Sequence, residues 1–378
     1  MKILLMSVKA GFGHHSTAAA IIEYFKERGH VCEMLDIFTY ISKHLGNTIQ
    51  DGYLISTKYL PKAYGKVYDI LNKEEEPYDE HSVISMLSKV VTKKLIGYVE
   101  DAAPDLIIGT HSYAAVVMTI LRDKGIVNCP LIGVVTDFTV HPFWESTDLD
   151  YYVIPDSQLT YQMNKKGIPS EKILPIGIPI RQIFAQKNSK EDARRRLSID
   201  DKPTLLIMMG SMGYGNIRET LTEIDEFEMD IQLLVVCGSN EKMKELIDTT
   251  EWHKDIRSYG FVSNVNELMD ASDLIITKPG GLTSSEAMAK GLPMIIMNPI
   301  PGQEDKNLVF LVNNGAAIAV NDVCTISEAL YQLTAQDWRA DLMRKSIEHI
   351  GKPNSTAKLY EFVMQEVFEK RESVLNRA

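Results

Sequence analysis

Short apolar runs alternate with amphipathic stretches along most of the chain. The runs suit buried parallel strands, whereas the stretches between them repeat apolar residues every three or four positions, which is typical of helices. This alternation predicts an α/β fold with a mostly parallel, doubly wound sheet. The strands predicted in the first half span residues 2–8, 31–37, 105–109, 131–136 and 151–155, and crossover helices are predicted over 16–28 and 113–124.

The second half of the chain repeats this architecture without repeating the sequence. A chain of 378 residues is too long for one ordinary core, so we expect two domains, at 1–180 and 190–352. Residues 353–378 are predicted to form a C-terminal helix with one apolar face. The strands predicted in the second half span residues 204–209, 231–237, 257–261, 274–277, 294–297 and 317–320.

Residues 38–102 interrupt the alternation, because no strand is evident there, and we expect a helical insertion in the first domain. Lysines and tyrosines share one helical segment within it, and a basic, aromatic, amphipathic helix is attracted to an anionic membrane surface. The alternative is a solvated helix packed on its own domain, which the acidic run 74–76 favours. The candidate membrane-contact residues are Lys58, Lys62, Tyr64, Lys66 and Tyr68.

Composition and charge narrow the class of protein. The formal net charge of -11 argues against nucleic acid as a partner, and any attraction to an anionic membrane must come from a local basic patch. No apolar run approaches the ~20 residues that span a bilayer, and the first residues lack a signal-peptide cleavage site. Four scattered cysteines are expected to be buried free thiols. We therefore expect a cytoplasmic protein.

The first glycine loop follows the first predicted strand and opens a helix. Gly11 and Gly13 permit a close approach between backbone and ligand, and His14 follows them. A histidine at a helix N-terminus has its pKa pushed down by the helix dipole, so it can accept a proton at neutral pH. A dinucleotide site is the remote alternative, with Asp36 as the ribose-binding acid, although Ser16 stands where that motif requires glycine.

A second set of polar residues follows the strand predicted at 131–136. Asp137 lies at the sheet edge where ligands bind in such folds, and it either orients His14, acts as the base itself or caps the next turn. His141 and Trp144 follow on the same loop. A tryptophan on a loop is either buried in the core or used in binding.

The second domain opens with a glycine-rich loop that contains Gly210, Ser211 and Gly213. It lies between a predicted strand and a predicted helix, so its backbone amides are suited to hold a diphosphate. One glycine loop in each domain fits a cleft for a donor and an acceptor better than it fits a single dinucleotide site.

A further turn, Pro279-Gly280-Gly281, follows the strand at 274–277. We expect a helix to begin at Leu282 or Thr283, with Thr283 or Ser284 as N-cap and Glu286 in the first turn. The free amides of its first turn favour an anion. A polar segment one strand later carries Gln303, Glu304 and Asn307.

These motifs resemble those of glycosyltransferase family 28. The turn at 279–281, the segment Pro301-Gly302-Gln303-Glu304 with Asn307, the Gly-x-Gly-His loop and the Thr-Asp and His-Pro-x-Trp patterns are similar to its diacylglycerol glycosyltransferase branch. That branch often has Gly-Pro-Gly where this chain has Pro-Gly-Gly. The resemblance implies the GT-B architecture, in which two Rossmann-like domains face a cleft and the last helix returns to the N-terminal domain.

The resemblance also implies roles for residues. Glu286 would hold the uridine ribose, Gln303 and Glu304 the donor hexose, and Phe261 and Val262 the base. His14 would be the general base, with Asp137 as helper or rival. The implied donor-binding residues are Gly210, Ser211, Gly213, Phe261, Val262, Gly280, Gly281, Thr283, Glu286, Gln303, Glu304 and Asn307, and the implied acceptor-binding residues are Gly11, Gly13, His141 and Trp144.

The expected activity is therefore an inverting transfer of a hexose from a UDP-sugar to diacylglycerol or a glycolipid. It would take place at the inner face of the cell membrane, with glucose favoured over galactose and repeated transfer possible. No Asp-x-Asp metal motif lies in a suitable loop, so we expect UDP-hexose as co-substrate and no essential metal. The alternatives are a family 28 transferase for a lipid-linked cell-wall precursor, a UDP-sugar epimerase of the same fold and a non-catalytic nucleotide-sugar sensor.

Overall fold

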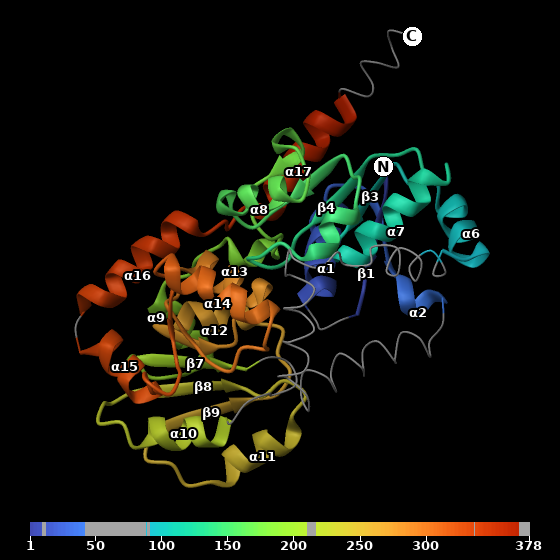
Figure 1. The fold of residues 1–378 in the computed structure, drawn as a ribbon. Coiled ribbons are helices and arrows are strands. Elements are labelled where there is room, and N and C mark those ends of the chain that lie inside the picture. Colours follow the sequence, from blue (N-terminus) through green and yellow to red (C-terminus); the bar gives the residue numbers. More distant parts are fainter. Residues whose placement is uncertain (10–12, 42–87, 89–90, 210–216, 336, 370–378) are drawn as a thin grey trace. The chain divides into compact units, whose positions relative to one another are not determined.

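The structure is a computed structural model that describes residues 1–9, 13–41, 88, 91–209, 217–335 and 337–369. The chain divides into two compact units (Figure 1). Unit 1 comprises residues 1–182, 301–303 and 354–378, and unit 2 comprises residues 183–300 and 304–353. Apart from residues 301–303, the chain therefore passes from unit 1 into unit 2 and returns to unit 1 for its last helix.

Among the described residues, unit 1 contains a parallel sheet with strand order β2-β1-β3-β4-β5-β6. The register aligns Ile3 of β1 with Cys32 of β2 and with Leu106 of β3. Crossover helices connect these parallel strands, so the predicted α/β fold is confirmed. The strands are β1 Lys2–Ser7, β2 Val31–Asp36, β3 Leu106–Gly109, β4 Leu131–Val134, β5 Tyr151–Val153 and β6 Ile173–Leu174.

Helices cover both faces of this sheet. Apolar side chains of α1 and α17 join those of the strands in one buried cluster. Gly109 faces the other side, where a β carbon would lie 2.6 Å from the Met118 sulfur of α7. The helices described in unit 1 are α1 Gly13–Lys26, α2 Ile37–Ile41, α6 Lys93–Ala102, α7 Ser112–Asp123, α8 Thr160–Lys165 and α17 Ser355–Phe362, with a π-helical continuation η5 at Val363–Glu369 and 3-10 turns η1 Pro142–Ser146, η2 Ser157–Leu159 and η3 Ser170–Lys172.

Helix α17 is part of unit 1 although it lies at the far end of the chain. The hydroxyls of Ser355 and Thr356 donate to the carbonyls of Ile178 and Ile180, at 2.8 Å and 2.6 Å. These bonds hold the returning chain against the segment by which it leaves unit 1. The apolar face of the helix completes the core of unit 1 through Leu359 and Val363.

Unit 2 contains a second parallel sheet, with strand order β12-β11-β10-β7-β8-β9. Helices α10, α15 and α16 contribute to one buried cluster with its strands. The strands are β7 Thr204–Met208, β8 Gln232–Val236, β9 Asp255–Tyr259, β10 Leu274–Thr277, β11 Met294–Ile296 and β12 Ala317–Ala319. The helices are α9 Lys190–Leu197, α10 Ile217–Asp225, α11 Glu241–Thr249, α12 Val265–Ala271, α13 Gly281–Lys290, α14 Gln303–Asn313, α15 Ile326–Thr334 and α16 Asp337–Ile350, and the 3-10 turn η4 Gln182–Phe184 begins the crossing from unit 1.

The predicted strands differ from the observed ones mainly at edges. The strand expected at 257–261 spans Asp255–Tyr259, because it is an edge strand on which polar residues remain exposed, so alternation gives a weak signal. Strand β6 was not predicted, since a two-residue edge strand is too short to form a pattern. Within the described part of the helix expected at 353–378, the chain divides into α17 and the π-helical η5.

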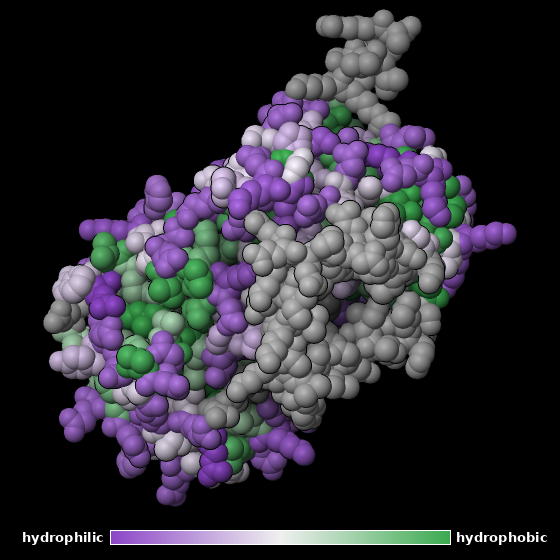
Figure 2. All heavy atoms as spheres, viewed as in Figure 1, coloured by the Kyte–Doolittle hydropathy of each residue, from purple (hydrophilic) through white to green (hydrophobic). Residues whose placement is uncertain are grey.

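Apolar side chains also reach the surface of unit 2. Figure 2 shows apolar residues, in green, in the region where Figure 1 labels α14, α15 and α16. The exposed large aliphatic side chains on these helices are Val309, Val312 and Leu342. The amphipathic segment expected within 38–102 lies largely outside the described residues, so the predicted contacts of Lys58, Lys62, Tyr64, Lys66 and Tyr68 stay predictions.

A buried ion pair fixes the segment that enters unit 2. The side chains of Lys290 and Asp270 are 1% and 3% exposed, and their charged atoms lie 2.8 Å apart. Lys290 also donates to the Gln186 carbonyl, and Asn188 donates to Asp270 at 2.7 Å. The pair thus joins the ends of α12 and α13 to residues 186–188.

Replacing Lys290 by Met should destabilise unit 2 by about 3–5 kcal/mol, because it leaves the Asp270 charge buried without its partner. Urea unfolding followed by circular dichroism measures the loss. Lys244→Met is the matched control, since Lys244 pairs with Asp248 on the exposed surface of α11, and its unfolding midpoint should stay near that of the parent. Equal shifts in the two variants would contradict this account.

Candidate active site

His14 lies at the start of α1, where the carboxyl edge of the sheet in unit 1 brings several strand ends together. Its Nδ1 atom lies 2.9 Å from the Thr110 carbonyl, which follows β3, and 2.7 Å from the Thr136 hydroxyl, which follows β4. A carbonyl oxygen only accepts, so Nδ1 carries the proton of the neutral ring. Nε2 is then the atom with a lone pair, as a general base requires.

Burial lowers the pKa of His14. The negative charge of Asp137 and the hydrogen bond to the Thr110 carbonyl raise the pKa in part, and His15 lowers it further. Because burial prevails, His14 is neutral at neutral pH. The predicted proton acceptor is therefore in the right protonation state, although the main cause is burial and not the helix dipole.

Two further histidines are held in the opposite tautomer. His111 caps α7 and accepts at Nδ1 from the Tyr113 amide at 3.0 Å, and His141 caps η1 and accepts from the Phe143 amide at 3.2 Å. The proton of each neutral ring therefore lies on Nε2. Burial first, and then the neighbouring histidines 14, 141 and 15, hold the pKa of His111 well below its usual value.

The rings of His14 and His111 meet edge to face, with centroids 4.5 Å apart. One ring has its lone pair on Nε2 and the other its proton, so the pair presents an acceptor and a donor at the same sheet edge. The sequence patterns pointed to His14 and His141 but not to Thr110 or His111, and they included Thr136 only as part of the Thr-Asp pattern. The only local signal for His111 was its position immediately after the strand at 105–109.

Asp137 lies beside this cluster but does not hold Nδ1 of His14, whose contacts are made by Thr110 and Thr136. Its charge acts on the ring through space. Asp137 does not directly follow β4, because the strand ends at Val134 and not at residue 136 as predicted. Its predicted role as helper or rival of His14 stays a prediction.

Asp36 is the acid that a dinucleotide site would need, but its carboxylate already contacts other residues of unit 1. Its Oδ2 lies 3.4 Å from Nε2 of His15, and the Thr39 amide donates to Oδ1 at 3.0 Å. Burial alone would raise the pKa of Asp36, but these hydrogen bonds outweigh burial and lower it. The carboxylate is thus committed to the start of α1 and the first turn of α2.

Trp144 lies inside unit 1, with 3% of its surface exposed. It fills the space beside Gly133, where a β carbon would lie 2.6 Å from the indole ring. Its ring also meets Tyr152 edge to face. Any contact with an acceptor remains a prediction, as does that of Gly13, the first residue of α1, and of Gly11, which lies outside the described residues.

In unit 2, the turn after β10 leads directly into α13. The helix begins at Gly281 with Gly280 as N-cap, and no side chain caps it. The expected start at Leu282 or Thr283 is therefore wrong by one or two residues, and Thr283 and Ser284 lie inside the helix. Glu286 lies in the second turn. Glycine at the N-cap leaves the first amides without a side-chain partner from that position, which suits an anion.

Helix α14 is tied to this turn by two of its side chains. Asn307 is fully buried and donates to the Pro279 carbonyl at 2.9 Å. Glu304 accepts from the Ile300 amide at 2.6 Å and pairs with Lys278 at 3.3 Å. The sequence patterns gave no signal for Lys278, because a lysine that follows a strand is usually a solvated residue.

Phe261 follows β9 and is 80% exposed, while Val262 is partly buried. A large aromatic ring left on the surface suits stacking, as the prediction for the base requires. Gln303 is the first residue of α14. Gly210, Ser211 and Gly213 lie outside the described residues, so their predicted contacts stay predictions.

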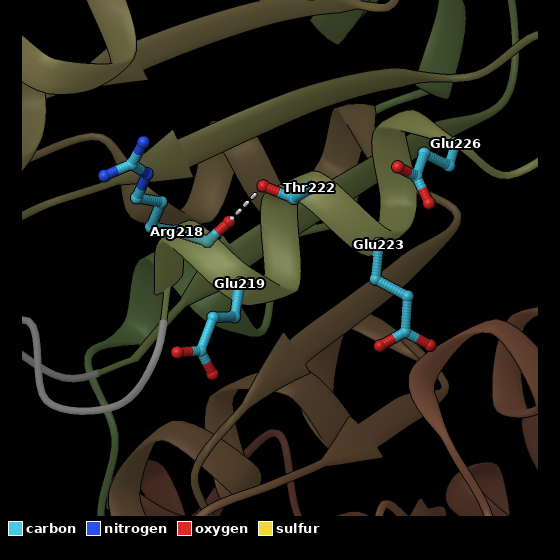
Figure 3. Close-up of a pocket in the computed structure, with 5 residues that line it drawn as sticks. All are labelled: Arg218, Glu219, Thr222, Glu223 and Glu226. Carbon is cyan, nitrogen blue, oxygen red and sulfur yellow. Dashed lines mark hydrogen bonds between the residues drawn. The ribbon is translucent and has the colours of Figure 1, made fainter.

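A hollow of about 480 Å³ runs along α10 and is distinct from the turn at 278–281. Figure 3 shows Glu219 and Glu223 projecting from one side of the helix while the Arg218 side chain extends the other way. Thr222 donates to the Arg218 carbonyl at 3.0 Å. Three carboxylates in its lining, Glu219, Glu223 and Glu226, make it unsuitable for a phosphate group.

Within the described residues, no helix is long and apolar enough to span a bilayer, and no three His, Cys, Asp or Glu side chains gather as metal ligands would. Cys32, Cys129 and Cys237 are buried free thiols as expected, whereas Cys324 is partly exposed.

The buried histidines predict how stability depends on pH. The folded pKa values of His14 and His111 lie below the ordinary 6.5, so the unfolded chain takes up protons first as pH falls. Stability should therefore be full above pH 6.5 and should decline below it. His111→Asn retains a capping side chain and should make this decline smaller, as measured by urea unfolding at pH 7 and pH 5. His349→Asn, at an exposed site on α16, is the control, and parallel curves for all three proteins would contradict the prediction.

Comparison with known proteins identifies the family. Residues 14–180 match the family described as monogalactosyldiacylglycerol (MGDG) synthase, and residues 204–357 match the glycosyltransferase family 28 C-terminal domain. A processive diacylglycerol beta-glucosyltransferase of Bacillus thuringiensis (strain Al Hakam) is 29% identical over 377 residues, which covers 97% of this chain and 94% of the relative.

Solved structures share the fold at low sequence identity. MurG of Acinetobacter baumannii superposes with a TM-score of 0.61 at 15% identity, covering 96% of this chain and 99% of that one. A UDP-GlcNAc 2-epimerase of Neisseria meningitidis bound to UDP-GlcNAc gives a TM-score of 0.58 at 15% identity, covering 97% and 100%. These likenesses show the fold, which is GT-B with two Rossmann-like domains, as predicted.

The two family matches follow each other along the chain and together extend through most of both units. The resemblance read from the motifs is thereby confirmed. The chain belongs to glycosyltransferase family 28, in the branch that contains the MGDG synthases, and it is a hexosyltransferase.

Proposed function

We propose that this protein transfers glucose from UDP-glucose to the free hydroxyl of diacylglycerol, with inversion at the anomeric carbon. The observation that carries the proposal is His14, whose neutral ring is held with its proton on Nδ1 and its lone pair on Nε2. The relatives named as processive diacylglycerol beta-glucosyltransferases support both the sugar and the acceptor. They also support further transfers onto the glycolipid product.

The reaction requires one proton acceptor and one leaving group. As the acceptor oxygen attacks the anomeric carbon, Nε2 of His14 takes the hydroxyl proton, and the bond from the sugar to UDP breaks with its electron pair on the phosphate. The imidazolium that forms keeps its proton on Nδ1, which donates to the Thr110 carbonyl and lies against the Thr136 hydroxyl. The charge of Asp137 favours that cation.

The donor is assigned to unit 2. Amides at the start of α13 and of the glycine loop with Gly210, Ser211 and Gly213 would stabilise the diphosphate as charge develops on it. Glu286 would bind the ribose, Gln303 and Glu304 the hexose, and Phe261 with Val262 the uracil. We assign no metal to these steps, because helix and loop amides supply the positive potential.

The acceptor is a membrane lipid, so we place the protein at the inner face of the cell membrane as a peripheral protein. Support comes from the lysines and tyrosines between residues 58 and 68, whose chemistry suits an anionic headgroup layer. Each lysine near such a surface contributes about 1 kcal/mol, and salt weakens that attraction.

A lipid product assay tests the function directly. The protein is incubated with UDP-glucose or UDP-galactose and diacylglycerol vesicles, and the lipids are analysed by mass spectrometry together with the UDP released. We expect monoglucosyl diacylglycerol, with longer glucosyl chains at later times. Conversion of the sugar nucleotide without any lipid would instead indicate an epimerase, and UDP binding without turnover would indicate a sensor. A galactolipid product would change the donor but not the reaction class, and activity only on a lipid-linked cell-wall precursor would overturn the acceptor.

The base assignment is tested by two substitutions. His14→Gln should lower kcat by about 100-fold or more, because a general base contributes that much or more to the rate. Thr136→Val keeps the shape but removes the hydroxyl at Nδ1 and should cost about tenfold. Both variants should retain the parent affinity for UDP, measured by calorimetry, since the donor is assigned to unit 2.

The pH profile gives an independent measurement. Because the pKa of His14 is lowered, kcat/KM should fall only below the ordinary histidine value of 6.5, and this acidic limb should disappear in His14→Gln. If Asp137→Asn abolishes turnover while His14→Gln barely changes it, Asp137 is the base and His14 its helper.

A further inference from the structure

Lys278 is an unusual lysine in unit 2, because only 11% of its side chain is exposed. It is the first residue after β10, and its carbonyl accepts from the Gly280 amide at 2.9 Å in the turn that leads to α13. A lysine is rarely buried this far unless an anion accompanies it. The side chain therefore needs a partner at the sheet edge.

That partner is Glu304 on α14, which is 16% exposed. Nζ of Lys278 lies 3.3 Å from Oε2 of Glu304, and the Ile300 amide donates to the same oxygen at 2.6 Å. The two donors come from different segments, one from the end of β10 and one from the loop after β11. Two donors converging on one oxygen fix both the place and the orientation of the carboxylate.

A second link shows that the ion pair is not needed merely to attach α14. Asn307 lies one helical turn after Glu304, and its fully buried amide donates to the Pro279 carbonyl. This neutral bond already ties the helix to the turn without a desolvated charge. A partly buried ion pair beside it adds little net stability, because desolvation offsets much of the attraction. Its presence at this edge therefore points to a role for the charged carboxylate.

We propose that Lys278 is a positioning residue for the donor sugar, holding the charged Glu304 carboxylate in the one orientation that receives hexose hydroxyls. The inference rests on the proposed function, in which Glu304 binds the hexose of the UDP-sugar. Lys278 acts through Glu304, so it affects the sugar half of the donor and leaves the nucleotide half unchanged.

Equilibrium binding separates the two halves. The affinities of the full-length protein for UDP-glucose and for UDP are measured by calorimetry for the parent, Lys278→Met, Lys278→Arg, Glu304→Gln and the double variant Lys278→Met/Glu304→Gln. Lys278→Met should weaken UDP-glucose about tenfold, the factor associated with one charge-assisted hydrogen bond, and change UDP less than twofold. Lys278→Arg, which keeps the charge, should recover most of the loss.

The double variant tests whether Lys278 acts through Glu304. It should bind UDP-glucose no more weakly than Glu304→Gln alone, because the two residues form one unit. Lys244→Met, which removes a lysine from an exposed ion pair of the same unit, is the matched control and should change neither affinity. In the lipid product assay, KM for UDP-glucose should rise in Lys278→Met more than kcat falls.

Three results would overturn the inference. Equal losses of affinity for UDP and UDP-glucose in Lys278→Met would mean that Lys278 contacts the phosphates itself. Additive losses in the double variant would mean that Lys278 acts independently of Glu304. Parent-like affinities in Lys278→Met would mean that the ion pair is only structural. If Lys278→Met does not fold, Glu304→Gln must still weaken UDP-glucose selectively, and equal losses there would also overturn it. A parent that binds UDP-glucose but forms no glycolipid would refute the proposed function alone.

Discussion

The parallel direction of every described strand is the constraint on which the site depends. Parallel strands end at one edge of their sheet, so residues that follow different strands become neighbours. In unit 1, this places Thr110 after β3 and Thr136 after β4 around His14, which opens the helix after β1. In unit 2, the same geometry places Lys278 after β10 beside the segment that follows β11.

Backbone groups, and not charged side chains, decide where the histidine protons lie. A carbonyl accepts from His14 and an amide donates to His111, the first from Thr110 in the loop after β3 and the second from Tyr113 in the first turn of α7. Neither contact depends on pH or on an ionisable partner, so the two tautomers are fixed for as long as the rings are neutral. Burial keeps both rings neutral, and the sheet edge thus carries a prepared acceptor and donor without a buried carboxylate on either Nδ1 atom.

Much of this arrangement could be predicted from the sequence. The contacts that could not be predicted join residues that lie far apart in the chain. Apolar runs marked the buried strands, and glycine turns after them marked His14 and the turn at 279–281 as candidate sites. Thr110 lies 96 positions from His14, and nothing local distinguishes it from other polar residues at strand ends. Thr136 belongs to the Thr-Asp pattern but lies 122 positions from His14, and nothing local indicates that its hydroxyl meets the ring. The burial of Trp144 depends likewise on Gly133, whose missing side chain leaves room for the indole ring.

The return of the chain to unit 1 has a consequence for biosynthesis. Leu359 and Val363 complete the core around β1 and α1, which are translated before unit 2. Unit 1 therefore cannot close its core until unit 2 has been translated, whereas the strands of unit 2 all lie between residues 204 and 319, so unit 2 is free to fold during synthesis. The hydroxyls of Ser355 and Thr356 meet the carbonyls of Ile178 and Ile180, so the entry and exit of unit 2 lie side by side. Unit 2 is thus an inserted domain, and folding of unit 2 first would bring together the two ends that the last helix must join.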